Sequence, residues 1–419
     1  MAIGDIYKLH LENITPGGDA LGRLNGKPVF VSGGAPDETV LCQITEDRNT
    51  WARAQLLEIV EPSSVRVNAV CAFYTQCGGC NLQHIDYETQ LKIKTSILRD
   101  SFLRIGGLEP PEIEVFDSPP FEYRNRMQFH CLREHRNNGP RNVHLRCTAD
   151  YRGKNTSEHK YGLKGRAASD IIAINDCPIA VSVIREILKP SSPSASLRLG
   201  EKKISIPPEK DRFTVFVKDE VLLNEGGQLK GKVKLLNKEI TVDAGLFFQS
   251  NCIMLEKLIL ELQKIAECAN RDLPMADLYC GVGTFALFLG DMFPKVILAE
   301  ENKAAVSLAR ENLKGINTEF FALRDTAWPD HLRSKWSGKP ESSIGFAVVD
   351  PPRAGLTPKL TASLVQSGPP VLAYVSCDPA SLARDSKILI NGGYTLQALK
   401  LFDFYPQTAH IESLAVFRK

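Results

Sequence analysis

Short apolar runs alternate with helix-like spacing through residues 246–419, and this alternation restricts the possible folds more than any other feature of the chain. Buried strands are predicted at residues 275–280, 296–300, 319–323, 346–350 and 371–377. The pattern predicts an α/β, doubly wound sheet of the Rossmann type with mostly parallel strands. The last two strands, 395–404 and 411–418, leave no room for a helix between them, so an antiparallel pair is expected.

Several polar residues stand where these strands end. Cys377 ends the fifth strand, and Asp350 ends the fourth just before two prolines that fix the backbone. In an open parallel sheet, ligands bind beyond the carboxyl ends of the strands. A reversed last strand would start at that edge, which places Glu412 beside Cys377, and Asp350 and Tyr279 are expected there too. The plainer interpretations are a buried structural thiol for Cys377 and an edge-strand surface residue for Glu412.

A glycine-containing loop, DLYCGVGTF at residues 277–285, follows the first strand. Gly281 and Gly283 allow a ligand to approach the backbone, and Glu300, after the second strand, can accept hydrogen bonds from ribose hydroxyls. The same spacing fits the dinucleotide fingerprint, so an NAD-dependent oxidoreductase is an alternative. The loop DPPRAG at residues 350–355 favours S-adenosylmethionine instead, because enzymes that methylate bases with this cofactor commonly carry a comparable loop.

Two further domains are predicted before residue 246. Residues 1–61 alternate apolar and polar residues in short runs, and the pair Asn25 and Gly26 is a strong hairpin signal, so a small OB-like β-barrel is expected. Residues 62–245 are expected to form a mostly β central domain. With five Lys/Arg against nine Asp/Glu, the barrel has a net charge of −4, which by itself does not favour nucleic acid.

Three closely spaced cysteines, Cys71, Cys77 and Cys80, indicate a metal site, because neighbouring thiolates repel one another unless a cation neutralises them. Cys177, which precedes a proline, is the best candidate for the fourth ligand. Iron–sulfur and structural zinc both accept four thiolates, so the residues alone leave the metal open, and three unligated thiols are the plainer alternative. Three other cysteines are expected in the core: Cys252, Cys268 and Cys280.

One segment, residues 124–166, is distinctly basic, with 11 Lys/Arg against three Asp/Glu. Its cations suit phosphate, and its aromatic residues, Tyr123 just before it and Phe129, Tyr151 and Tyr161 within it, could stack on unpaired bases. The segment is therefore a candidate RNA-contacting surface. A solvated loop face explains such a run of charge equally well.

The N-terminus lacks the features of a signal peptide, and no apolar run approaches the roughly 20 residues of a membrane helix. A cytoplasmic protein without a membrane partner is therefore expected. The net charge of +2 identifies no partner for the whole chain, and nothing indicates an obligate protein partner. The 11 cysteines are an odd number without a secretion signal, which favours metal or catalytic thiols over disulfides.

Five motifs occur in the order seen in the RNA 5-methyluridine (uracil-C5) methyltransferase family: FFQSN at 247–251, DLYCGVGTF at 277–285, DPPR at 350–353, SCDP at 376–379 and PQTAHIE at 406–412. The four cysteines and the start of the chain, which is similar to a TRAM-type RNA-binding module, resemble the iron–sulfur branch that modifies 23S ribosomal RNA. The resemblance covers essentially the whole chain, loosely so at residues 180–245.

The resemblance implies a role for each matched residue. The nucleophile would be Cys377 and the base Glu412. The contacts to S-adenosylmethionine would come from Gln249, Tyr279, Thr284, Glu300 and Asp350. The cluster would be [4Fe–4S], held by Cys71, Cys77, Cys80 and Cys177. The family usually has asparagine where this chain has Asp378, whose carboxylate would disfavour a thiolate nearby. Glu301, next to Glu300, is a second candidate for the ribose contact.

The implied chemistry requires these residue types. A thiolate that adds to carbon 6 of uracil makes carbon 5 nucleophilic enough to accept a methyl group, and a base must then remove the proton on carbon 5. The sequence therefore predicts an enzyme that methylates carbon 5 of a uridine in RNA, with ribosomal RNA favoured over transfer RNA by the resemblance alone. The rival from another class is an iron–sulfur RNA-binding protein without catalytic activity.

Overall fold

The computed structural model describes residues 1–131, 161–166, 170–189, 197–199, 202–204, 211–330 and 344–419. Its chain divides into two compact units, and neither is continuous in sequence. The first contains Met1–Ile97, Pro119–Thr214 and Tyr405–His410; the second contains Leu98–Ser118, Val215–Phe404 and Ile411–Lys419. None of the described helices is long and apolar enough to cross a membrane. The predicted division into three domains is not tested by these units and stays a prediction.

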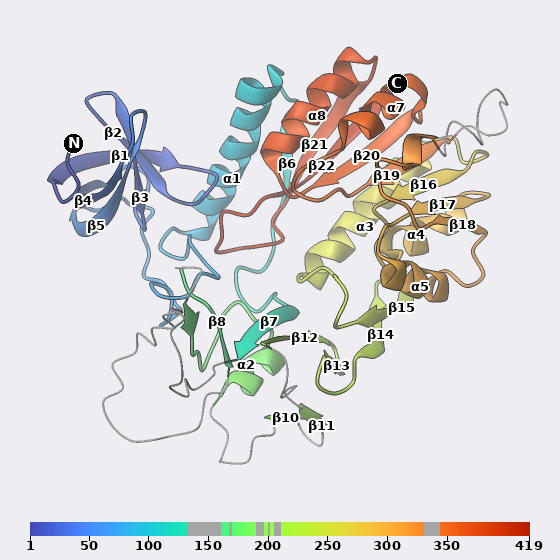
Figure 1. Cartoon of the computed structure of the whole chain (residues 1–419), viewed down its shortest axis with the longest axis horizontal. Coiled ribbons are helices and arrows are strands. Elements are labelled where there is room, and N and C mark those ends of the chain that lie inside the picture. The colour runs from blue at the N-terminus through green and yellow to red at the C-terminus, as the bar shows by residue number, and fades with distance from the viewer. Residues whose placement is uncertain (132–160, 167–169, 190–196, 200–201, 205–210, 331–343) are drawn as a thin grey trace, which may run out of the picture. The chain divides into compact units, whose positions relative to one another are not determined.

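The first unit begins with the predicted β-barrel (Figure 1). Its strands are β1 (Ile6–Ile14), β2 (Ala20–Leu24), β3 (Lys27–Ser32), β4 (Thr39–Asp47) and β5 (Ala52–Glu61). They close in the order β1-β2-β3-β5-β4 around buried side chains such as Leu11, Val29 and Val40. Asn25 and Gly26 turn between β2 and β3 with positive φ angles of 52° and 82°, so the hairpin signal is confirmed.

The rest of the first unit is built around the start of α1 (Tyr87–Ser101), which continues as a π-helical turn at Phe102–Gly106. The segment Tyr405–His410 is held here although it joins two strands of the second unit. Gln90 accepts a hydrogen bond from Gln407 N at 2.9 Å, and Asn81 Oδ1 accepts one from Ala409 N at 2.8 Å. Neither bond belongs to a β-sheet, so side chains take the place of a neighbouring strand as partners for the backbone N–H groups of Gln407 and Ala409.

The central part of the first unit contains short strands and one short helix. They are β7 (Arg126–Cys131), β8 (Tyr161–Lys164), β9 (Ile171–Ile172), α2 (Ser182–Leu188), β10 (Leu197–Leu199) and β11 (Lys202–Ile204). Two aromatic residues suggested for base stacking belong to its core instead. Tyr123 is fully buried and donates to Pro406 O, and Phe129 is buried against the Phe213 ring. The prediction that both residues stack on bases is therefore wrong, because their rings are packed in the apolar core.

Two β-hairpins, the first of which begins at the end of the first unit, precede the sheet of the second unit in the chain. The hairpins pair β12 (Arg212–Lys218) with β13 (Val221–Asn224), and β14 (Lys230–Leu235) with β15 (Lys238–Asp243). The sheet has eight strands in the order β18-β17-β16-β19-β20-β22-β21-β6. Its strands are β16 (Met275–Leu278), β17 (Val296–Ala299), β18 (Thr318–Phe321), β19 (Phe346–Val349), β20 (Val371–Ser376), β21 (Thr395–Phe402), β22 (Glu412–Arg418) and β6 (Ile113–Phe116).

All seven strands predicted in this sheet are present, and the mostly parallel α/β fold is confirmed. β22 runs antiparallel to both β20 and β21, as expected for the last pair of strands. The edge strand β6 was not predicted. It comes from a part of the chain far from the other seven strands and pairs in parallel with β21, and only long-range contacts bring it there.

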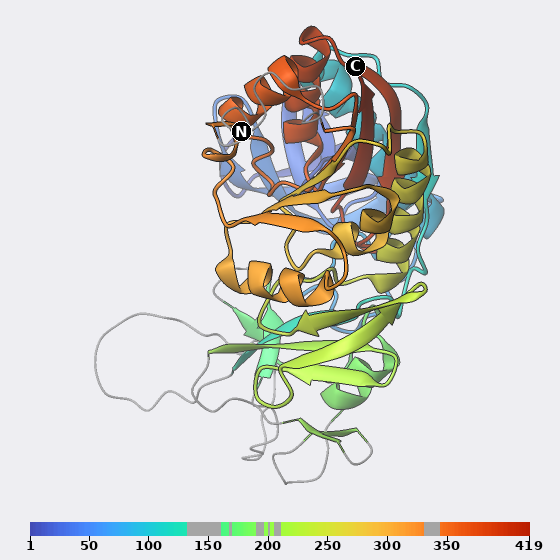
Figure 2. The ribbon, with the colours of Figure 1, turned by 90° about the vertical axis from the view of Figure 1, so that its right-hand side faces the viewer.

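Helices cover both faces of the sheet (Figure 2). α3 (Cys252–Glu267) packs with α4 (Thr284–Leu289) on one face, and α7 (Pro358–Ser367) packs with α8 (Pro379–Asn391) on the other. α5 (Lys303–Asn312) connects β17 to β18. The strand ends that carry Asp350, Cys377 and Glu300 therefore meet at one edge, as right-handed crossovers between parallel strands require.

Candidate active site

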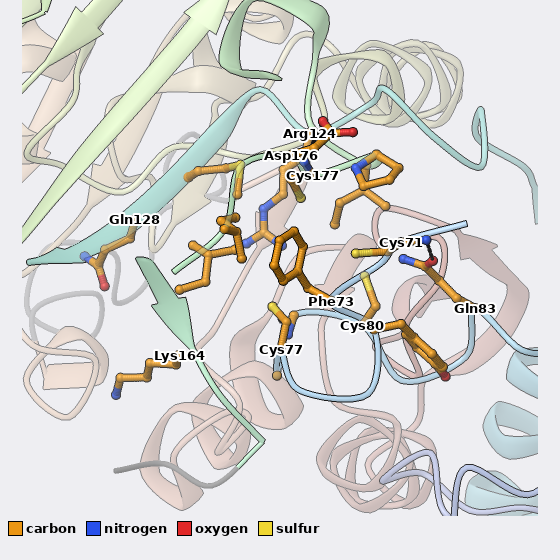
Figure 3. Close-up of a pocket in the computed structure, with 18 of the residues that line it drawn as sticks. Cys71, Phe73, Cys77, Cys80, Gln83, Arg124, Gln128, Lys164, Asp176 and Cys177 are labelled. Carbon is orange, nitrogen blue, oxygen red and sulfur yellow. Dashed lines mark hydrogen bonds between the residues drawn. The ribbon is translucent and has the colours of Figure 1, made fainter. Parts of the chain in front are cut away.

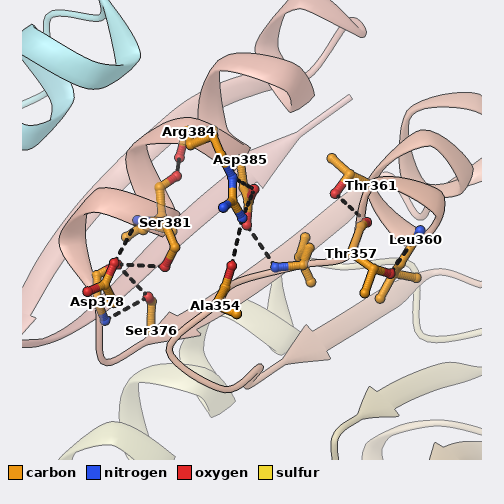
Figure 4. A network of polar contacts seen from close by, with 12 residues as sticks. Ala354, Thr357, Leu360, Thr361, Ser376, Asp378, Ser381, Arg384 and Asp385 are labelled. Carbon is orange, nitrogen blue, oxygen red and sulfur yellow. Dashed lines mark hydrogen bonds and ion pairs between the residues drawn. The ribbon is translucent and has the colours of Figure 1, made fainter. Parts of the chain in front are cut away.

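Cys377 lies between the end of β20 and the start of α8. Asp378 caps the helix, because its Oδ1 accepts a hydrogen bond from Ser381 N at 2.7 Å and Pro379 occupies the first helical turn (Figure 4). Asparagine could accept the same bond. The Cys377 residue is half-buried.

Glu412 is the first residue of β22 and is only 4% exposed. Ser413 pairs with Ser376, and its hydroxyl donates to Ser376 O at 3.2 Å. Extending this antiparallel register by one residue sets Glu412 opposite Cys377, so the predicted meeting of the two residues is found. The edge-strand surface interpretation of Glu412 is wrong, because the residue is buried between β20 and β21.

The charges confirm that these groups are neighbours. Burial, together with the negative charges of Glu412 and Asp350, raises the pKa of the Cys377 thiol to about 11, although the positive charge of Arg353 lowers it. Burial also raises the pKa of Glu412 well above its usual range, with Asp350 adding to the shift and Arg353 again opposing it. Two carboxyl groups and a thiol therefore influence one another here, and Arg353 favours the ionised forms of Cys377 and Glu412.

The loop after β16 has the geometry of a ligand-binding turn. Gly281 and Gly283 have φ angles of 54° and 83°, and Tyr279 also has a positive φ, 64°, which a residue with a large side chain adopts at a cost in energy. Glu300 Oε2 accepts a hydrogen bond from Gly281 N at 3.2 Å. Glu301 instead pairs with Arg324 at 3.4 Å and is exposed, so Glu300 is the glutamate that faces the loop.

Two buried polar atoms of the second unit have no hydrogen-bond partner in the described structure: Asp277 Oδ1 and Gln249 Oε1. Buried polar groups are normally paired, so both atoms fit a polar ligand. Gln249 lies in the loop that precedes α3. Thr284 begins α4 and is half-buried. Tyr279 donates its hydroxyl to Asp325 Oδ2 at 3.0 Å.

Sequence reasoning missed Asp277 and Arg353 as site residues. Asp277 is fully buried, and burial raises its pKa to about 8, with Asp350 and Glu300 adding to the shift. The sequence signal that could have revealed Asp277 was an acidic residue inside the otherwise apolar strand at 275–278. Arg353 stood in a recognised motif, but its effect on Cys377 and Glu412 depends on a loop geometry that spacing does not give.

The four cysteines predicted as metal ligands line one cavity of about 220 Å³ in the first unit (Figure 3). Gly78 N donates to Lys164 O at 2.9 Å, and a Cβ on Gly78 would lie 2.6 Å from Gly165 O, so only glycine allows the loop to approach that backbone. Cys177 reaches the cavity from a loop that is fixed by the ion pair of Asp176 with Arg185, whose atoms stand 2.8 Å apart.

The thiols of this cavity also influence one another. Burial raises the pKa of Cys177 to about 12, and Cys80, Cys77 and Cys71 contribute to the increase. Within the described residues, however, no group of three or more His, Cys, Asp or Glu is arranged to hold a metal ion. The structure therefore brings the four predicted residues to one cavity without forming a ligand shell around a single point.

Most of the basic segment, residues 132–160, lies outside the described residues, including Tyr151, and the Tyr161 side chain is not described either. Two of its described arginines have structural contacts. Arg124 lines the cysteine cavity and donates to Arg126 O at 3.2 Å. Arg166 lies over the Tyr74 ring at 5.2 Å and donates to Tyr74 O at 3.0 Å. Two of the other predicted core thiols, Cys252 and Cys280, are buried, but Cys268 is exposed at the end of α3.

Comparison with known proteins identifies the family of this chain. The family model described as tRNA (Uracil-5-)-methyltransferase matches residues 218–324 and 341–419, and the TRAM domain model matches residues 2–57. The chain is 30% identical to an "Uncharacterized RNA methyltransferase" of Aquifex aeolicus over 98% of this chain and 97% of that protein. A protein of the same description from Treponema denticola is 32% identical over 94% of each chain. The chain belongs to the RNA uracil-C5 methyltransferase family.

Further relatives have more specific names. The 23S rRNA (uracil(1939)-C(5))-methyltransferase RlmD of Shewanella halifaxensis is 28% identical over 96% of this chain and 93% of its own. The crystal structure of the Pyrococcus abyssi tRNA (uracil-54, C5)-methyltransferase in complex with S-adenosyl-L-homocysteine superposes with a TM-score of 0.68 and 22% identity, covering 98% of this chain and 100% of that one. This likeness shows that the two proteins share a fold.

Family membership decides the class of enzyme. The chain is an RNA (uracil-C5)-methyltransferase that uses S-adenosylmethionine, and its TRAM domain supports the predicted RNA substrate. The alternatives of an NAD-dependent oxidoreductase and of a binding protein without catalytic activity are therefore wrong. The glycine spacing that suggested NAD is shared by both kinds of nucleotide site, because both need close approach to the backbone.

Proposed function

We propose that the protein methylates carbon 5 of one uridine in 23S ribosomal RNA, with Cys377 as nucleophile and Glu412 as base. The observation that supports this most is the reversed strand β22, which sets Glu412 opposite Cys377 at the strand-end edge. A nucleophile and a base that act on adjacent carbons of one pyrimidine ring must come from neighbouring positions, and this register supplies them.

Five residues are proposed to hold S-adenosylmethionine: Gln249, Tyr279, Thr284, Glu300 and Asp350. The unpaired Gln249 Oε1 and Asp277 Oδ1 fit this ligand, because its ammonium group and hydroxyls can donate to buried oxygens. When bound, the cofactor supplies the methyl group as an electrophile. A cation beside Asp350 favours the ionised form of its carboxyl, whose pKa is raised by burial in the free protein.

Each step of the proposed reaction has a group for it. The Cys377 thiolate would add to carbon 6 of uracil, and the electrons of the C5–C6 double bond would make carbon 5 the nucleophile. When bound, S-adenosylmethionine would give up its methyl group to carbon 5 and leave as S-adenosyl-L-homocysteine. Glu412 then removes the proton that remains on carbon 5, and the electrons of that bond expel the Cys377 thiolate to give 5-methyluridine. Burial raises the pKa of Glu412 and so makes its carboxylate a stronger base than an exposed one.

Arg353 has a place in the same scheme. Its positive charge lowers the pKa of Cys377, while burial, Glu412 and Asp350 raise it. At neutral pH a thiol with a pKa of about 11 is almost entirely protonated, so addition to uracil depends on groups that favour the thiolate. We therefore assign to Arg353 the stabilisation of the Cys377 thiolate.

The choice of 23S ribosomal RNA is supported by the names of relatives such as RlmD of Shewanella halifaxensis, which is 28% identical to this chain. Transfer RNA is the second candidate, because the family model is named for it and the Pyrococcus abyssi enzyme acts on it. A uridine stacked within folded RNA must be flipped into the pocket, at a cost of a few kcal/mol, and contacts from the TRAM barrel would offset that cost.

Mass spectrometry of RNA from a deletion strain tests the substrate. We expect one 5-methyluridine to disappear from a 23S ribosomal RNA fragment, with transfer RNA unchanged, and to return when the wild-type chain is expressed. A strain that expresses Cys377→Ala is the matched control and should not restore it. Loss of 5-methyluridine from transfer RNA alone would contradict the ribosomal assignment and support the second candidate.

We also propose that Cys71, Cys77, Cys80 and Cys177 hold a [4Fe–4S] cluster. All four line one cavity, and Cys80, Cys77 and Cys71 each add to the raised pKa of Cys177, a repulsion between thiolates that a bound cation would relieve. A four-iron cluster binds its thiolates at separate corners, so they need not converge on one point as ligands of a single zinc ion do. Four thiols around one cavity suit either kind of centre, and the choice of the cluster rests on the resemblance to the iron–sulfur branch of the family.

Anaerobic purification tests this proposal. The wild-type protein should be brown, with broad visible absorption and roughly four iron and four sulfide per chain. Cys177→Ser should lose the colour, whereas Cys252→Ser, which changes a buried thiol in α3 of the other unit, should keep it. A colourless wild-type preparation that carries zinc would show that the cluster assignment is wrong.

A further inference from the structure

The carboxylate of Asp385 connects α8, β20 and the loop that follows β19 (Figure 4). The residue lies on α8 and is 1% exposed. Its Oδ2 accepts hydrogen bonds from Tyr374 of β20 and from Leu356 N, each at 2.8 Å. Its Oδ1 pairs with Arg384 at 2.7 Å. A buried carboxylate with this many donors is anchored, so the elements that it joins are held together.

The loop that follows Asp350 depends on these contacts. Arg384 donates to Ala354 O at 2.8 Å, so the loop is bound to α8 on both sides of Gly355. Gly355 has a φ of 77°, and a Cβ there would lie 2.5 Å from Asp385 Oδ2, so the backbone passes directly over the carboxylate. Arg353 stands just before this anchored stretch.

We propose that Asp385 is a positioning residue that fixes the 350–356 loop against α8 and thereby holds Arg353 where its charge acts on Cys377 and Glu412. The proposal rests on the proposed role of Cys377. The proposal assigns Asp385 no contact with substrate or cofactor, and its effect on the reaction passes through the loop.

Whether the alkylation of Cys377 slows or speeds up when Asp385 is removed distinguishes this positioning role from a direct effect of the Asp385 charge on the thiol. Removing a nearby negative charge would by itself lower the pKa of a thiol and speed its alkylation. If Asp385 acts by holding Arg353, its removal releases the arginine, and the thiol loses a positive charge that opposes Glu412 and Asp350. Alkylation of Cys377 should then slow.

The experiment measures the rate at which iodoacetamide modifies Cys377 between pH 7 and 10, followed by peptide mass spectrometry without RNA or cofactor. Cys268, exposed at the end of α3, is the internal reference. In wild-type protein the rate should rise with pH throughout, because the Cys377 pKa of about 11 lies above the range. Asp385→Ala should be roughly threefold to tenfold slower at each pH, the effect of up to about one pKa unit.

A double-mutant cycle decides whether Arg353 carries the effect. Arg353→Ala alone should slow alkylation by a similar factor, and adding Asp385→Ala to it should slow the reaction no further. An unchanged or faster rate in Asp385→Ala, or the same slowing in both backgrounds, would overturn the proposal. Because no RNA is present, failure here is distinct from failure of methyl transfer.

Two more variants keep the test decisive if Asp385→Ala does not fold. Arg384→Gln leaves Asp385 in place but removes the bond to Ala354 O, and it should show the same dependence on Arg353. Tyr394→Phe is the control for losing a buried hydrogen bond: its hydroxyl donates to Pro369 O at 2.8 Å, away from the 350–356 loop, and its alkylation rate should equal that of the wild type. Additive slowing in Arg384→Gln and Arg353→Ala would overturn the proposal.

Discussion

Replacing Cys377 with alanine should lower methyl transfer by roughly four orders of magnitude or more while leaving cofactor binding intact. Without the thiolate, carbon 5 of uracil is too weak a nucleophile, and none of the neighbouring carboxyl groups can take the place of the sulfur. The measurement is transfer of a labelled methyl group to a 23S ribosomal RNA fragment, together with calorimetric binding of S-adenosyl-L-homocysteine.

The fold should tolerate this change, because Cys377 is half-buried and alanine removes only its sulfur. Cys268→Ala, a change at an exposed thiol in the same unit, is the matched control and should retain full activity. Turnover by Cys377→Ala at more than about a hundredth of the wild-type rate would show that another group attacks the pyrimidine.

Replacing Glu412 with glutamine should stop the reaction after methyl transfer and trap the chain on its RNA. Glutamine cannot accept the proton on carbon 5, so the bond between Cys377 and carbon 6 is not broken. Burial already favours the uncharged form of Glu412, and glutamine imitates that form in size and charge, so the protein should stay folded. The adduct should appear as a denaturant-resistant protein–RNA band whose mass includes one methyl group.

The double variant Cys377→Ala, Glu412→Gln is the control for this experiment and should form no adduct. Multiple turnover by Glu412→Gln would assign the base to another residue. An adduct of unmethylated RNA would place the defect before methyl transfer, which would also contradict the proposed role.

Much of the second unit was predictable because local signals and burial agree there. The strands at residues 275–280 and 371–377 are mostly apolar on both faces, as is typical of strands covered by helices on each side, and all of β16 and β20 is buried. The two prolines after Asp350 and the Asp-Pro pair after Cys377 mark strand and helix ends through backbone geometry alone.

The first unit was less predictable. Aromatic residues in a basic segment are equally common in cores and on binding surfaces, and Tyr123 and Phe129 proved to be core residues. Gln90 and Asn81 hold the segment 405–410 far from them in sequence, and no local pattern indicates such a contact. A side chain that hydrogen-bonds the backbone of a residue far away in the sequence produces no periodic pattern in the sequence.

The sequence by itself determined the strand and helix order of residues 246–419, the chemical groups at each strand end and the cysteines available for a metal. These follow from periodicity, turn chemistry and residue type, which act over a few neighbouring residues. Only the tertiary structure decided that β22 sets Glu412 opposite Cys377, that four cysteines share one cavity and that Asp385 anchors the loop of Arg353. Those arrangements depend on packing between segments far apart in the chain, and packing is a property of the folded whole.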